Sequence, residues 1–226
     1  TRWTFHLGTL SLAIVIVGGT VAVGIGYDLD LVLSAACLLG FACLAFYARD
    51  VLQLYRKRVR RVIELNSRMA SIALANFAAA VMLTIACIAF GVLEQHIGAL
   101  VFLFCFGWLT GLGLAKLYKI VAFVTWLECY GPVLGKTPTP RVQDLVVEPR
   151  AAKWFWFYFA AVAIGTLCLF AGASLPFRMA AAAMTAATAG IVFELLQTRR
   201  LINVSDALRL PTGAHRPRLL FTFVPG

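Results

Sequence analysis

Long apolar runs alternate along the chain with shorter polar or charged stretches. Each run is close to the length of about 20 residues that crosses the hydrocarbon core of a bilayer as a helix. Lipid cannot satisfy an exposed backbone, so a helix is the conformation that such runs adopt. The pattern therefore predicts an all-α, polytopic membrane helix bundle of six transmembrane helices, at approximately residues 5–27, 31–48, 71–93, 97–115, 154–173 and 177–196.

Residues 116–153 separate the fourth and fifth runs and differ from both. They hold two lysines, a shorter apolar stretch and a polar stretch with several prolines. We interpret residues 116–153 as an interfacial segment that folds along the membrane surface. The prediction for the whole chain is a transmembrane domain at residues 1–200, which includes this segment, followed by a cytoplasmic tail at residues 201–226.

Composition supports a membrane protein, because 62% of the residues are apolar and only 13% are charged. In soluble domains, about a quarter of the residues are charged. The net charge of +10 predicts orientation rather than binding to nucleic acid, since all basic residues except Arg178 lie near the N-terminus, in the two long loops or in the tail. By the positive-inside rule we expect both termini in the cytoplasm and the chain in a bacterial inner membrane.

A dense basic cluster follows the second predicted helix and consists of Arg56, Lys57, Arg58, Arg60 and Arg61. A cluster at this position next to a membrane span attracts anionic lipids. The lipid bilayer and its anionic lipids are therefore expected partners. Docking of an acidic partner protein is the alternative.

Two lysines at the end of the fourth predicted helix, Lys116 and Lys119, lie three residues apart and so on one helix face. Counting along the helices places them near the depth of Glu194, whose carboxylate would be costly to leave unpaired in a membrane span. We predict that one of the lysines pairs with Glu194 and ties the fourth predicted helix to the sixth. The alternative is that both lysines reach lipid headgroups.

Small residues mark packing faces in the fourth and sixth predicted helices. The fourth contains a GxxxG motif, from Gly107 to Gly111, followed by Gly113, and the sixth is rich in alanine. Small side chains let helix backbones approach closely. We expect these faces to pack inside the chain or against another subunit.

The positions of the three histidines bear on whether the chain could bind haem or copper. His6, His96 and His215 do not share both a side and a depth of the predicted bundle, whereas haem or copper needs imidazoles that converge from facing helices. The six cysteines are scattered without a CxxC, and no catalytic or nucleotide-binding motif occurs. The sequence predicts no catalytic residue, metal ligand or cofactor of its own, and haem only if a partner supplies ligands.

The passage LYKIVAFVTWLECYG at residues 117–131, with the following KTPTPRVQDL, resembles the later part of bacterial membrane proteins that are similar to subunit I of haem–copper oxidases. The resemblance covers about forty residues and implies a fold like the C-terminal half of that family of about twelve helices. Glu128 and Cys129 stand where the family has a histidine-bearing pair, and Ala122 replaces a proline. The resemblance therefore implies a fold and a membrane setting, without metal ligands.

These observations favour a non-catalytic integral membrane subunit or accessory protein of a larger, respiratory or electron-transfer complex, with other membrane subunits as partners. A small-solute transporter or channel is the alternative, for which the uncharged Asn76, Thr84, Thr110, Thr166, Thr185 and Thr188 are the candidate polar residues at mid-membrane. A second alternative is a haem-binding redox membrane protein whose ligands come from a missing half or a partner.

Overall fold

The computed structural model describes residues 2–26, 29–57 and 64–217, and every regular element in these ranges is a helix. Within them, five helical stretches are long and apolar enough to cross a membrane: Trp3–Gly24, Leu65–Ala89, Leu93–Val133, Glu148–Phe170 and Ser174–Arg199. The second predicted run lies in a sixth helix, α3 (Leu29–Arg56), whose side chains are described only in part. The prediction of an all-α protein with membrane-spanning helices is confirmed.

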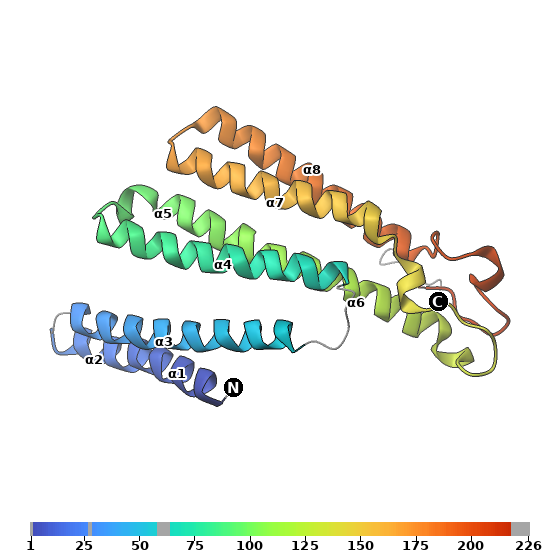
Figure 1. Cartoon of the computed structure of the whole chain (residues 1–226), viewed down its shortest axis with the longest axis horizontal. Coiled ribbons are helices and arrows are strands. Elements are labelled where there is room, and N and C mark those ends of the chain that lie inside the picture. The colour runs from blue at the N-terminus through green and yellow to red at the C-terminus, as the bar shows by residue number, and fades with distance from the viewer. Residues whose placement is uncertain (1, 27–28, 58–63, 218–226) are drawn as a thin grey trace. The chain divides into compact units, whose positions relative to one another are not determined.

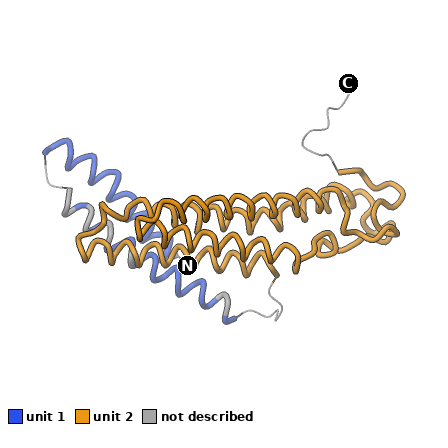
Figure 2. Tube along the Cα trace, turned by 90° about the horizontal axis from the view of Figure 1, so that it is seen from above, with its two compact units in different colours: residues 1–62 blue, residues 63–226 orange. Residues whose placement is uncertain are grey.

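The chain divides into two compact units, residues 1–62 and residues 63–226, where the sequence had suggested one domain over residues 1–200 (Figure 2). Unit 1 is a helical hairpin of α1 (Arg2–Ala13), a π-helical turn η1 (Ile14–Gly18), α2 (Gly19–Gly24) and α3. The two sides of the hairpin approach closely, because Gly8 leaves room for the sulfur of Cys43 and Gly18 leaves room for Val32. Thr4 also donates a hydrogen bond of 3.0 Å to Asp50.

Unit 2 holds two long hairpins (Figure 1). The first pairs α4 (Leu65–Ala89) with one continuous helix made of α5 (Leu93–Phe102), the π-helical η2 (Leu103–Thr110) and α6 (Gly111–Tyr130). The second pairs α7 (Glu148–Phe170) with α8 (Ser174–Arg199). Both hairpins reverse at a glycine with φ of +67°, Gly91 and Gly172, a conformation that suits glycine because it has no Cβ.

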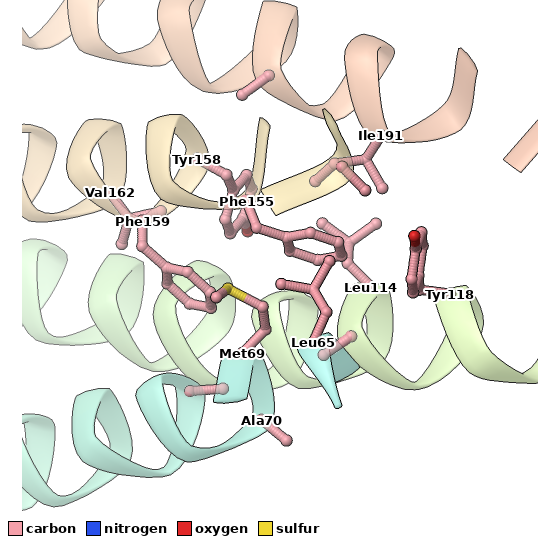
Figure 3. Close-up of a cluster of buried hydrophobic side chains, with 14 of the residues drawn as sticks. Leu65, Met69, Ala70, Leu114, Tyr118, Phe155, Tyr158, Phe159, Val162 and Ile191 are labelled. Atoms are coloured by element: carbon pink, nitrogen blue, oxygen red, sulfur yellow. The ribbon is translucent and has the colours of Figure 1, made fainter. Parts of the chain in front are cut away.

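The core of unit 2 is built from aliphatic and aromatic side chains of all four long helices. Leu65, Met69, Leu114, Phe155 and Ile191 belong to one buried cluster, and Figure 3 shows their side chains extending from α4, α6, α7 and α8 into a shared interior. Rings of the cluster meet edge to face, the geometry that aromatic pairs prefer, as Tyr118 does with Phe155. The four helices therefore form one packed body.

The segment predicted to lie along the interface from residue 116 is different in the structure. The helix continues through Lys116 and Lys119 without a break and ends only at Tyr130, where Gly131 and Pro132 follow in a short 3-10 turn, η3 (Gly131–Val133). Nothing between Gly113 and Gly131 is a glycine or proline that would end a helix. The helical stretch Leu93–Val133 has 41 residues, about twice the length that crosses a bilayer core.

Residues 131–147 and 200–217 fold together against the end of α6, and we call these two segments the cap (Figure 1). Their elements are η3, η4 (Val142–Leu145) and η5 (Asp206–Leu208). Cap residues Leu145, Leu201 and Val204 share a small buried cluster with Cys129 and Tyr130 of α6. Polar bonds close the cap: Tyr130 donates to the carbonyl of Arg209 across 2.7 Å, and Trp126 donates to that of Pro140 across 2.7 Å.

Candidate functional site

Charged side chains from four elements meet at one end of the helices of unit 2, next to the cap. We call this group the charged belt; its members are Glu64, Lys119, Glu148, Arg150 and Glu194. Direct contacts link them level by level, since Lys119 pairs with Glu64, the backbone N–H of Leu65 donates to Glu148, and Arg150 pairs with Glu194. Each contact joins two different elements. The belt therefore joins the first turns of α4 and α7 to α6 and to the last turns of α8.

Arg150 is the centre of the belt. Its Nε donates to Oε1 of Glu194 across 2.6 Å, and its Nη2 donates to Gln197 and, across 3.2 Å, to Asn203. Asn203 in turn donates to the backbone carbonyl of Leu145 across 3.0 Å. Because the Glu194 side chain is only 4% exposed, this ion pair supplies the positive charge that a buried carboxylate needs. The network ties α7, α8 and both segments of the cap together.

The structure corrects the predicted pairing of Lys116 or Lys119 with Glu194. Glu194 pairs with Arg150, Lys119 pairs with Glu64 across 2.5 Å, and Lys116 is exposed and has no ion-pair partner among the described residues. The physical reason is the start of α7, which lies at Glu148 rather than near Trp154. The extra turn brings Arg150 to the depth of Glu194 on the neighbouring helix.

A cavity of about 220 Å³ opens beside the belt, between the start of α4, α6 and the cap segment that precedes α7. Glu64, Asn66, Tyr118, Lys119, Gln143 and Glu148 provide its polar lining. Tyr118 is 4% exposed, and its buried hydroxyl has no hydrogen-bond partner within the described structure. A buried hydroxyl without a partner is unfavourable, so this oxygen would gain from a hydrogen bond to a water or solute.

A second, more open groove of about 490 Å³ lies between α7 and α8. Its lining combines Arg150 and Lys153 with the aromatic rings of Trp154, Phe157 and Phe193. The indole of Trp154 lies directly over Gly190, where any Cβ would overlap it. The groove therefore has cationic groups at one end and apolar walls.

The three glycines predicted to pack differ in their surroundings. A Cβ on Gly107 would lie 3.1 Å from Cβ of Asn76, and one on Gly111 would lie 2.8 Å from the ring of Phe159. These two glycines let α4 and α7 approach the long helix. Gly113 is different, because a Cβ there would meet nothing within 4 Å. It faces open space and is not part of a packing face within the chain.

The basic cluster after the second predicted helix falls mostly outside the described residues. Arg56 and Lys57 are described and exposed at the end of α3. Arg58, Arg60 and Arg61 lie outside the described part of the chain. Contact of this cluster with anionic lipid stays a prediction.

Sequence reasoning missed Glu64, Glu148 and Arg150 of the charged belt, and Tyr118 of the cavity. Arg150 follows Glu148 and Pro149, and an acid followed by proline is a signal for the first turn of a helix that could have moved the predicted start of α7. Tyr118 has no such signal, because the lack of a hydrogen-bond partner for its hydroxyl depends on which side chains surround it in three dimensions. No sequence pattern marks a hydroxyl that lacks a partner.

No family model matches the chain, and neither a curated protein nor a solved structure was found to be similar to it. Within the described residues, no group of three or more His, Cys, Asp or Glu side chains could hold a metal ion. The structure by itself shows a polytopic helical membrane protein. Its function has to be argued from its surfaces and its polar contacts.

Proposed function

We propose that the chain is a non-catalytic integral membrane subunit, or accessory protein, of a larger membrane complex. The resemblance of residues 117–131 to oxidase-like membrane proteins supports a respiratory or electron-transfer complex as the partner. The excess of basic residues at the cap end of unit 2 supports a bacterial inner membrane with the cap and both termini in the cytoplasm. One surface of α6 carries the proposal.

An apolar stripe covers the outer face of α6 beyond the lysines. It consists of Ile120, Phe123, Val124 and Leu127, each about half exposed. Their spacing of three, four and seven residues places them on one helix face. Contiguous exposed apolar surface on a protein marks a contact with another molecule.

The position of this stripe distinguishes it from an ordinary lipid-facing surface. The helix that begins at Leu93 needs about 20 residues to cross the bilayer core, and the exposed Lys116 and Lys119 then mark its exit. The stripe follows these lysines. The opposite face of α6 is already covered, because Ala122, Thr125 and Cys129 are buried. This position supports a partner subunit as the occupant of the stripe.

The use of charge in unit 2 supports a structural role. Arg150 and Glu194 hold α7 on α8, Arg199 pairs with Glu128 across 2.5 Å, and Arg209 donates to the backbone carbonyls of Leu201 and Val204. These side chains fix the shape of the helix ends and the cap. A platform of fixed shape suits the docking of another protein, because little conformational entropy is lost on binding.

The test is purification of the tagged chain from its native membranes in a mild detergent, followed by the intact mass of the assembly. We expect a fixed ratio of this chain to a cofactor-bearing complex. The variant carrying both Val124→Gln and Leu127→Gln should lose at least about tenfold of the bound partner. Its unfolding temperature should be unchanged, because both side chains are exposed.

The matched control is Ile202→Gln, which changes an equally exposed apolar residue in the cap. This variant should keep the partner. A wild-type chain that purifies alone, or only with copies of itself, would contradict the proposal. Full retention of the partner by the double variant would show that the stripe faces lipid instead.

A second candidate function is the binding of a small solute for transport, and the cavity beside Tyr118 favours it. Tyr118, whose hydroxyl has no partner in the described structure, and Glu148 both line this cavity. A solute with a hydrogen-bonding amine or hydroxyl would satisfy both groups. Uptake into vesicles should then fall in Tyr118→Phe, whereas uptake equal to that of empty vesicles by the wild-type chain would exclude this function.

A further inference from the structure

We propose that the groove between α7 and α8 binds one anionic phospholipid, with its phosphate at Lys153 and Arg150 and an acyl chain along Phe157 and Phe193. This inference depends only on the membrane setting of α7 and α8. It does not depend on the proposed partner subunit.

The polar and apolar residues of the groove follow one another along the helices in the same order as the headgroup and acyl chains of a phospholipid along the membrane normal. Arg150 and Lys153 lie in the first two turns of α7, and Gln197 lies in the last turns of the antiparallel α8. Phe157 and Phe193 lie one turn further from the cap on each helix. The polar end of the groove is thus at the charged belt, and its apolar end points into the span.

Charge in the groove selects an anion. Glu194 is paired with Arg150, so the two charges offset each other. Lys153 is exposed and has no hydrogen-bond or ion-pair partner among the described residues. Arg150 still has a side chain that is 41% exposed. One net positive charge with ammonium and guanidinium N–H donors matches the single negative charge and acceptor oxygens of a phosphodiester.

The walls suit an acyl chain. Phe157 and Phe193 are 45% and 58% exposed, so their rings have free surface on the outside of the helix pair. Trp154 lies at the boundary between the polar and apolar parts, the depth at which indole rings favour the membrane interface. Gly190 allows the indole to lie close against α8, because it has no Cβ. A headgroup alone would leave this apolar wall unused.

The experiment is native mass spectrometry of the delipidated chain in detergent, titrated with phosphatidylglycerol or with phosphatidylcholine of the same acyl chains. We expect one phosphatidylglycerol to bind at least about tenfold more tightly than phosphatidylcholine. Both lipids carry the phosphodiester, but the choline group of phosphatidylcholine adds a positive charge that cancels the phosphate charge and is repelled by Lys153. Inorganic phosphate should neither bind nor compete, since it has no acyl chain. Equal binding of the two lipids, or full competition by phosphate, would overturn the proposal.

Two variants with matched controls locate the site. Lys153→Gln should reduce the preference for phosphatidylglycerol about tenfold, whereas Lys136→Gln, at another exposed lysine, should not. Phe157→Ala should weaken the binding of both lipids by a similar factor. Phe90→Ala, which changes an exposed ring at the far end of α4, should leave the binding of both lipids unchanged. All four side chains are exposed, so the variants should fold. A wild-type lipid profile in Lys153→Gln would place the bound lipid elsewhere.

Discussion

Arg150 and Glu194 form an ion pair between α7 and α8 that is buried on one side only. The distance from Nε of Arg150 to Oε1 of Glu194 is 2.6 Å, and the side chains are 41% and 4% exposed, respectively. If Arg150 is lost, a carboxylate stays buried without a cation. If Glu194 is lost, the arginine can still reach water. Loss of Arg150 should therefore destabilise the protein more than loss of Glu194.

Arg150→Met should lower the free energy of unfolding by about 2–3 kcal/mol, less than for a pair buried on both sides. Glu194→Gln should cost only about 1 kcal/mol, because the amide oxygen still accepts a hydrogen bond from Arg150. Unfolding of both variants in detergent measures the difference. Lys119→Gln is the control, since its pair with Glu64 is solvent-exposed and should contribute less than about 1 kcal/mol. Equal losses in Arg150→Met and Glu194→Gln would contradict the asymmetry.

Gly190→Ala and Gly113→Ala make the same chemical change in two surroundings. At Gly190 the new methyl group would overlap the indole of Trp154, and the strain should cost about 1–3 kcal/mol of unfolding free energy. At Gly113 the methyl group meets open space, and alanine should stabilise the helix by up to about 1 kcal/mol. Thermal unfolding of the two variants should therefore shift in opposite directions. A shift in the same direction would mean that Trp154 can move aside.

Tyr130→Phe and Tyr118→Phe each remove one buried hydroxyl. The hydroxyl of Tyr130 donates to the carbonyl of Arg209, and its loss should destabilise the cap by about 1 kcal/mol. The hydroxyl of Tyr118 has no partner in the described structure, so its loss should not destabilise the protein and should stabilise it by up to about 1 kcal/mol.

Opening of the cap can be followed through Cys129, which is fully buried beneath it. Maleimide labelling of this thiol, followed by peptide mass mapping, should be several-fold faster in Tyr130→Phe than in the wild type, because about 1 kcal/mol corresponds to such a factor. Labelling in Tyr118→Phe should match the wild type. Faster labelling in Tyr118→Phe alone would reverse the roles assigned to the two tyrosines.

Tyr158 connects α7 to the π-helical part of the long helix. Its hydroxyl donates to the carbonyl of Phe106 across 2.8 Å, and the N–H of Gly111 bonds to the same carbonyl. Tyr158→Phe should cost about 0.5–1 kcal/mol, the usual contribution of a hydrogen bond between membrane helices. Hydrogen exchange of the amides in η2 should increase more than exchange in α4. Unchanged exchange in η2 would show that the π-helical winding does not need this bond.

The hydropathy pattern was sufficient to predict where the apolar helices lie, but it was not sufficient to predict where they end. The apolar runs coincide with helices because lipid leaves the backbone no other choice. Lys116 and Lys119 were mistaken for the end of the long helix, since a change in polarity does not interrupt backbone hydrogen bonding. Only Gly131 and Pro132 do so. Hydropathy indicates whether a helix is surrounded by lipid or by water, whereas glycine and proline indicate where the helix ends.

Partner choice within the site was harder to predict, and Glu194 shows why. Its depth was correctly expected to require a cation, but the identity of that cation depended on where α7 begins. A shift of six residues at the start of α7, from Trp154 to Glu148, exchanges a lysine partner on α6 for Arg150. Interhelical pairs depend on the register of two helices, and an error in either register changes the pair.

The π-helical winding of η2 has a consequence for the stripe on α6. A π-helix bonds each N–H to the fifth preceding carbonyl, so it accommodates more residues per turn than an α-helix. If η2 rewound as an α-helix, every residue after Thr110 would rotate about the helix axis relative to α5. The direction in which Ile120 and Val124 face is therefore set by hydrogen bonds within the span, several turns away. The winding of η2 thus sets which way the apolar stripe on α6 faces.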